Sequence, residues 1–131
     1  MEIKIKSFNG IGDLLFVTPT LRRIKEQYPA ARIIVNTNYP ALIKDNPHVG
    51  AVNEGRDGVF LGYADPIHRV NPMKHHIVSD WEIVSREYGL QLDLPDLKPE
   101  IYLPVPRGGN RRGSIGVQVI HKGHWHQKKI W

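Results

Sequence analysis

The segment from residue 2 to residue 37 constrains the fold most, because its apolar residues change their period twice. Residues 2–7, EIKIKS, alternate apolar and polar side chains, which predicts a half-buried strand. Apolar residues then recur every three or four positions, the pattern of one helix face: Leu14, Val17, Leu21, Ile24 and Tyr28. Residues 32–37, RIIVNT, predict a second strand. Strand, turn, helix and strand in this order predict a βαβ unit and therefore an α/β fold with a parallel sheet.

The rest of the first 100 residues continues this alternation. A short helix is expected within 38–47, with Asn38 as its N-cap and Pro47 as its end. VFLGY, residues 59–63, predicts a further strand. A longer helix is expected from residue 79, where Ser79 and Glu82 have capping-box spacing, and Gly89 suits its C-terminal end. Its buried stripe is expected to consist of Trp81, Val84 and Tyr88.

Pro19 falls inside the first predicted helix. A proline has no N–H, so the carbonyl group of Leu15 loses its usual partner in the helix. We therefore expect a kink or an irregular first turn at this point.

The overall composition is that of an ordinary globular protein. Of the 131 residues, 40% are hydrophobic and 24% are charged, which argues against general disorder. No apolar run approaches the ~18 residues of a membrane span, and no signal peptide precedes the first strand. The absence of cysteine excludes disulfides and thiolate chemistry. These features favour a cytoplasmic protein.

The positive net charge comes from the C-terminal part of the chain. Residues 1–100 contain 12 Lys or Arg and 13 Asp or Glu, whereas residues 101–131 contain six basic residues and no acidic one. Residues 105–114 include RGGNRRGS and read as a basic linker, and IGVQVI then predicts a new strand. We expect three parts: a Rossmann-like domain over 1–104, the linker 105–114, and the first strand and loop of a truncated second domain over 115–131.

The turn NGIGD, residues 9–13, is the best candidate for a functional site. A dinucleotide-binding turn would place a third glycine where Leu15 stands, and a P-loop would need a Gly-Lys-Ser/Thr sequence; neither is present. The acid at Asp13 has two readings. It can be a helix N-cap, which stabilises a helix by ~0.5–2 kcal/mol. It can also be a general base, because turns at the carboxyl ends of parallel strands are where open α/β sheets place their sites.

A resemblance to a known family favours the second reading. The segment NGIGDLLFVTPTLRRIKEQYP resembles the opening of the ADP-heptose:lipopolysaccharide heptosyltransferase family, glycosyltransferase family nine. Further similarities are NPHV at 46–49, GLQLDLPDLKPEIYLP at 89–104, and IGVQVI followed by KIW at 115–131. The hydroxyl residues that usually precede the family's lysine are replaced here by HKGHWHQ.

The resemblance implies the N-terminal half of a GT-B enzyme, which has two Rossmann-like domains facing a cleft. The implied reaction is an inverting transfer, without metal or cofactor, from a nucleotide-sugar donor such as ADP-heptose to a lipopolysaccharide core or similar glycan. Asp13 would be the catalytic base, Gly10 and Gly12 would leave room for the acceptor, and Lys129 would contact the donor diphosphate. The implied location is the cytoplasm or the cytoplasmic face of the inner membrane. With most of the donor domain missing, the 131-residue chain is expected to be inactive alone.

Alternative functions follow from other features. The basic C-terminal part would suit a non-enzymatic binding module for an anionic partner, with Asp13 only a cap; we expect no nucleic acid. A small nucleotide-binding regulator or oxidoreductase domain is a further alternative. His121, His124 and His126 are close in sequence but have no acid nearby, so we expect no metal site. His68, Arg69 and Lys74 are cationic candidates for holding an acidic acceptor.

Overall fold

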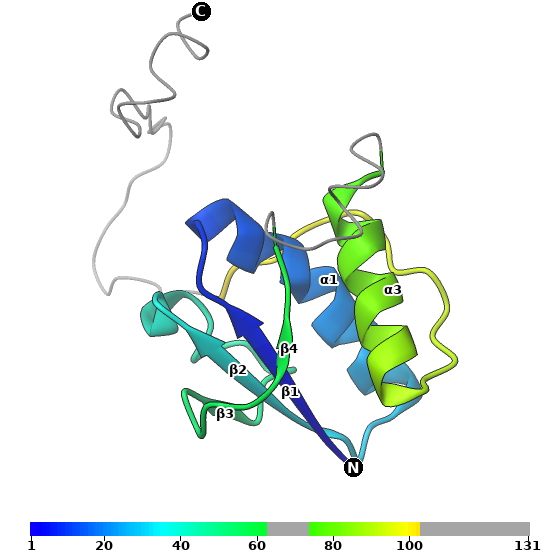
Figure 1. Ribbon diagram of the computed structural model, residues 1–131, viewed down its shortest axis with the longest axis horizontal. Helices are drawn as coiled ribbons and strands as arrows, with labels where there is room; N and C mark the ends of the chain where they lie inside the picture. Colours follow the sequence, from blue (N-terminus) through cyan, green and yellow to red (C-terminus); the bar gives the residue numbers. More distant parts are fainter. Residues whose placement is uncertain (63–73, 103–131) are drawn as a thin grey trace, which may run out of the picture.

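The fold is a parallel α/β sheet, as the sequence predicts, and the two α-helices of the described residues pack on one of its faces (Figure 1). We describe a computed structural model, in which residues 1–62 and 74–102 are placed. The predicted linker 105–114 and segment 115–131 lie outside these ranges. In chain order the elements are β1 (Glu2–Ser7), α1 (Ile11–Gln27), β2 (Arg32–Thr37), η1 (Pro40–Leu42), β3 (Ala51–Val52), β4 (Val59–Phe60) and α3 (His76–Tyr88). The strand order is β3-β2-β1-β4, and all pairs are parallel.

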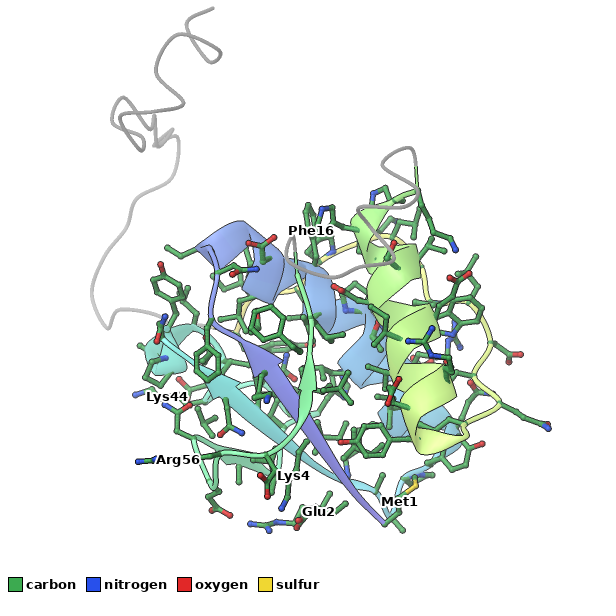
Figure 2. The ribbon with its side chains drawn as sticks, in the orientation of Figure 1. Met1, Glu2, Lys4, Phe16, Lys44 and Arg56 are labelled. Carbon is green, nitrogen blue, oxygen red and sulfur yellow. The ribbon has the colours of Figure 1, made fainter. Side chains whose placement is uncertain are left out.

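The main core lies between the sheet and the two α-helices. Strands β1 and β2 pair over six residues, with Ile3 opposite Ile33 and Ile5 opposite Val35. These four side chains and the predicted stripe of α1 from Leu14 to Ile24 are buried. Helix α3 packs beside α1 and adds Ile83 and Val84 to the same cluster (Figures 1 and 2). The apolar residues that alternate along the strands and those that form the helix stripe therefore pack together in one apolar layer.

The other face of the sheet is crossed by the connection from β3 to β4. Because β3 and β4 lie at opposite edges, residues 53–58 must pass over both β2 and β1. Asn36 on this face donates from Nδ2 to the carbonyl oxygen of Asp57 at 3.3 Å. Gly58 has φ +134°, and a Cβ there would lie 2.7 Å from the backbone oxygen of Lys4. Glycine is thus required where the connection meets β1.

Helix α1 continues through Pro19 as one α-helix, without the irregular first turn that we expected. The Thr18 hydroxyl donates to the carbonyl oxygen of Leu15 at 2.7 Å, and this is the carbonyl that Pro19 leaves without an N–H partner. The same hydroxyl accepts a hydrogen bond from the backbone N–H of Glu100 at 2.8 Å. One buried hydroxyl therefore repairs the helix and fixes a segment 82 residues away.

Residues 90–102 have no regular secondary structure and form a strap along α1. The strap runs backwards along the helix. Asp93 N–H bonds Gln27 Oε1 at 2.8 Å, whereas Glu100 N–H bonds Thr18, more than two turns nearer the helix start. Arg22 forms ion pairs with both Asp96 and Glu100. The strap therefore returns the chain from the amino-terminal edge of the sheet toward its carboxyl edge.

Glu100 is the point where three parts of the chain meet. Its carboxylate binds the Arg22 guanidinium and accepts from the Tyr102 hydroxyl at 2.8 Å, and His48 Nε2 lies 3.8 Å from it. The rings of His48 and Tyr102 are nearly perpendicular, with centroids 6.3 Å apart. Burial and the Arg22 charge lower the pKa of His48 below its ordinary value of 6.5. His48 comes from the β2–β3 connection, so that connection is joined to the strap.

Two helix boundaries differ from the prediction. Within 38–47 the structure has only the 3₁₀ turn η1, preceded by Tyr39, and Asn38 is not a cap. The Asn38 side chain instead donates from Nδ2 to the carbonyl oxygen of Phe8 at 3.0 Å. A contact between distant segments has replaced the local cap.

Helix α3 begins three residues before the predicted capping box. His75 is the N-cap, and its Nδ1 accepts from Ile77 N–H at 3.2 Å. Ser79 is consequently a buried residue inside the helix. The predicted end is confirmed, because Gly89 has φ 61° and its N–H closes the last turn. Val84 of the predicted stripe is fully buried, whereas Trp81 and Tyr88 are half-buried at the border of the core.

Replacing Thr18 by valine should destabilise the fold by about 1–3 kcal/mol, because the Leu15 carbonyl and the Glu100 N–H both lose their partner. Thr20→Val is a matched control, since the Thr20 hydroxyl is buried but has no hydrogen-bond partner among the described residues. Urea unfolding of both variants measures the difference. Equal losses in the two variants would contradict the role given to Thr18.

The stability of the protein should fall as the pH decreases below about 6.5. His48 binds its proton less readily in the folded protein than in the unfolded chain, so protonation favours unfolding between 6.5 and the lowered folded pKa. His48→Gln should flatten this part of the profile. The measurement is the free energy of unfolding from pH 7.5 to 5.5, and parallel profiles for the two proteins would exclude His48 as the cause.

Candidate functional site at the carboxyl edge of the sheet

The turn between β1 and α1 lies at the carboxyl edge of the sheet, beside the end of β4. The strand order reverses at this point, because the chain passes from β1 to β2 on one side and returns to β4 on the other. Open α/β sheets bind ligands at such positions. Two large apolar side chains are exposed near the turn, Phe8 at 40% and Ile11 at 48%. The edge thus has the topology of a binding site, with two exposed apolar side chains close to the turn.

Asp13 occupies the third position of α1, so the first of its two readings, as the N-cap itself, is wrong. The N-cap is Gly10, and Asp13 Oδ2 accepts from the Gly10 backbone N–H at 2.9 Å. This is the reciprocal half of a capping box, which a carboxylate at the third helical position can form. No other hydrogen bond to the Asp13 side chain occurs among residues 1–62 and 74–102. The cap bond therefore fixes one carboxylate oxygen and leaves Oδ1 available to a ligand.

Gly10 and Gly12 are not required by the fold itself. Gly10 has φ −97°, which any residue adopts, and a Cβ there would meet only Asp13 Oδ2, at 3.5 Å. A Cβ at Gly12 would contact nothing within 4 Å. Glycine is a favoured N-cap residue, which accounts for Gly10. Gly12 lies inside the helix, where glycine is less stable than alanine by about 0.5–1 kcal/mol, and the packing of the turn gives no reason for it.

Asn9, which the sequence analysis placed in the turn without giving it a role, and Gly62, which it missed, also belong to this site. Gly62 has φ +121°, and a Cβ there would lie 2.6 Å from Asn9 Nδ2 and 3.6 Å from Asp13 Cβ. The end of β4 thus lies directly against the turn. Asn9 Nδ2 is buried and has no acceptor among the described residues. The Asn-Gly pair in the sequence marks the turn, but only the β1–β4 pairing brings Gly62 to it.

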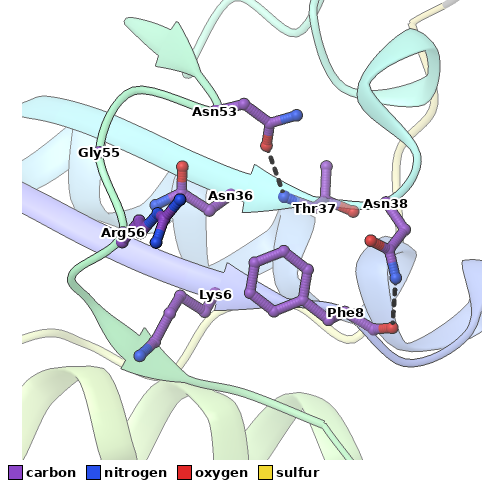
Figure 3. Close-up of a pocket in the computed structure, with 8 residues that line it drawn as sticks. All are labelled: Lys6, Phe8, Asn36, Thr37, Asn38, Asn53, Gly55 and Arg56. Carbon is purple, nitrogen blue, oxygen red and sulfur yellow. Dashed lines mark hydrogen bonds between the residues drawn. The ribbon is translucent and has the colours of Figure 1, made fainter.

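A pocket of about 530 Å³ opens at the same edge, over the ends of β1 and β2 (Figure 3). Asp13 does not line it. Lys6 and Phe8 come from the end of β1, and Asn36 comes from the end of β2. Arg56 and Asn53 belong to the crossing connection. Figure 3 shows the two cationic side chains on one side of the Phe8 ring.

Hydrogen bonds hold the frame of this pocket. Asn53 Oδ1 accepts from Thr37 N–H at 2.8 Å, and Asn38 holds the Phe8 carbonyl (Figure 3). Sequence patterns did not indicate the pocket, because its residues are spread over three segments of the chain and contain no motif.

The other predicted site residues fall into two groups. Lys74 is described and forms an ion pair with Glu82 of α3, so its charge is neutralised locally. His68, Arg69, Lys129 and the three histidines 121, 124 and 126 lie outside the described residues. Within the described ranges no group of acids and histidines has a metal-binding arrangement. No helix there is long and apolar enough to cross a membrane.

Comparisons with known proteins give one distant likeness. No protein-family model matches the chain, and no curated protein matches it. Among solved structures it is similar to the crystal structure of the glycosyl transferase family 9 from Veillonella parvula DSM 2008, with 16% identity and a TM-score of 0.37. The match covers 67% of this chain and 22% of the other, so the chain spans about a fifth of that protein.

The glycines of the edge should respond in opposite ways to alanine. Gly62→Ala should destabilise the fold by about 1–3 kcal/mol, because the backbone is left-handed and Cβ would overlap Asn9. Gly12→Ala should stabilise it by up to about 1 kcal/mol. Thermal or urea unfolding measures both. Destabilisation by Gly12→Ala would show that the fold itself needs glycine there.

Proposed function

We propose that this chain is the acceptor-side domain of an inverting glycosyltransferase that resembles family nine, with Asp13 as the general base. The observation that carries the proposal is the state of the Asp13 carboxylate. One oxygen is fixed by Gly10 N–H, the other is available, and Gly12 beside it is a glycine that the fold does not need. A small-residue turn that presents a fixed carboxylate suits a bulky hydroxyl substrate.

The chemistry follows from this placement. A sugar hydroxyl of the acceptor would hydrogen-bond to Asp13 and give up its proton to the carboxylate as its oxygen attacks the anomeric carbon of the donor. The new bond joins the acceptor oxygen to this carbon, and the bond from the carbon to the nucleotide diphosphate breaks. Attack from the face opposite the leaving group inverts the anomeric centre. The nucleotide diphosphate leaves with the electron pair of the broken bond.

The resemblance in the sequence supports the finer parts of the proposal. The Gly-Asp turn and the Thr-Pro pair occur in the family's order, and Thr18 and Pro19 act together in α1. We propose a heptose or related sugar from a nucleotide-sugar donor, and a lipopolysaccharide core or similar glycan as acceptor. A second Rossmann-like domain would hold the donor, with Lys129 at its diphosphate. The reaction would take place in the cytoplasm or at the cytoplasmic face of the inner membrane, without a metal.

Asp13→Asn tests the base directly in the full-length protein. The amide oxygen can still accept from Gly10 N–H, so the fold should lose no more than about 1 kcal/mol, the effect of one charge at a helix start. Transfer from a nucleotide-sugar should fall by about 10²–10⁴-fold. Asp45→Asn, an exposed acid in the β2–β3 connection, is the control. Normal turnover by Asp13→Asn would leave Asp13 as a cap only and favour a binding module.

Gly12→Ala tests whether glycine is present at this position to leave space for the acceptor or to stabilise the fold. If the acceptor approaches Asp13 over Gly12, the added methyl group should raise the KM for the acceptor while the melting temperature stays equal or rises. The measurement is the acceptor KM beside a thermal unfolding curve. Unchanged kinetics in a stabilised variant would place the acceptor elsewhere.

A further inference from the structure

We propose that the pocket over β1 and β2 binds a small organic anion, a sugar that carries a phosphate or a carboxylate group. This site goes beyond the proposed function, because Asp13 does not line it and the argument uses none of the transfer chemistry. It rests on three features of the described residues: two cations without partners, a buried amide oxygen without a donor, and an exposed aromatic ring.

The two cations differ from the other basic residues nearby. Lys4, on the same strand, is paired with Glu2 at 3.2 Å, and Arg32 is paired with Glu2 and Glu54. Lys6 and Arg56 have no ion pair among the described residues, although both line the pocket. Arg56 pairs with neither of the two acids close to it in the sequence, Glu54 and Asp57, so its lack of pairing reflects where the side chain is placed.

Among the described residues, no acidic side chain lines the pocket to compensate these charges. Glu54, two residues before Arg56, is held by Arg32. Asp57 is the next residue, but it contributes its backbone oxygen to Asn36 and is not part of the lining. Two positive charges that face one hollow attract an anion and repel a cation. The ligand therefore carries negative charge at the Lys6–Arg56 side.

Asn36 supplies the polar contact. The residue is 2% exposed, and its Nδ2 is used by Asp57, but its Oδ1 has no donor among the described residues. A buried amide oxygen without a partner is unfavourable, and a ligand hydroxyl or water would satisfy it. A ligand that has both an anionic group and separate hydroxyl groups can donate to this oxygen while its charge meets Lys6 and Arg56.

Phe8 supplies the apolar contact. Its side chain is 40% exposed and stands between the cations and Asn38 (Figure 3). Its backbone is fixed by the Asn38 side chain, so the ring is presented from a defined position. Binding pockets commonly combine such an aromatic surface with a few placed polar groups. The two cations favour an anionic group, the Asn36 oxygen favours a hydroxyl that donates, and the Phe8 ring favours an apolar surface of the ligand. A sugar phosphate or a sugar acid combines these features.

Binding of four probes to the full chain tests the site, measured by titration calorimetry and by the side-chain amide signals of Asn36 in NMR spectra. The probes are glucose 6-phosphate, glucuronate, glucose and inorganic phosphate. We expect one or both sugar anions to bind at least tenfold more tightly than glucose and phosphate, with a shift of the Asn36 signals. Stronger binding of the phosphate or of the carboxylate identifies the anionic group.

Variants show whether the pocket is responsible. Lys6→Gln and Arg56→Gln should each weaken the binding of the sugar anion by roughly tenfold, which is the effect of one charged hydrogen bond. Lys98→Gln, in the strap, removes the same charge elsewhere and should have no effect. Phe8→Ala should abolish the tighter binding of the sugar anions relative to phosphate. Leu97→Ala, the control, should leave that difference in affinity unchanged. Equal binding by all four probes, or equal losses in Lys6→Gln and Lys98→Gln, would overturn the proposal.

Discussion

The parallel pairing of β1 with β2 beneath α1 is the constraint on which the rest of the structure depends. The apolar faces of the two strands and the stripe of α1 can leave water together only when Ile3 faces Ile33 and Ile5 faces Val35. A shift by one residue would turn these side chains to the opposite face. The register then places Ser7 beside Thr37, so both strands end at one edge. The turn with Asp13 and the pocket with Lys6 both lie there because of this pairing.

The Thr18 hydroxyl joins this unit to the later part of the chain. A proline inside a helix leaves a carbonyl group unpaired, and Thr18 corrects the defect while accepting from Glu100. The strap then gathers Arg22, His48 and Tyr102 around the Glu100 carboxylate. These contacts bring residue 102 back along α1 toward the carboxyl edge. The Thr-Pro pair therefore has a structural purpose that does not depend on any reaction.

Two chemically different regions share the edge. Around Asp13 there is one anionic carboxylate, three glycines and the buried amide of Asn9. Around Lys6 and Arg56 there are two cations and an aromatic ring. The first suits the removal of a proton from a hydroxyl, and the second suits the capture of an anion. Phe8 and Asn9 are adjacent in the chain, so one short segment contributes to both.

The sequence by itself determined the βαβ unit, the parallel sheet, the buried stripe of α1 and the left-handed glycine at the end of α3, because each depends on a local period or a backbone preference. It also marked Asp13 as the residue of interest.

Predictions from local patterns failed where groups distant in the sequence compete for the same side chain or backbone. Asn38 binds Phe8 instead of capping a helix, and α3 begins at His76 instead of at the capping-box spacing of Ser79. Only the tertiary structure decided that Gly62 meets the turn and that Lys6 and Arg56 share a pocket, because these residues meet through strand order and a crossing connection, which no spacing in the sequence encodes.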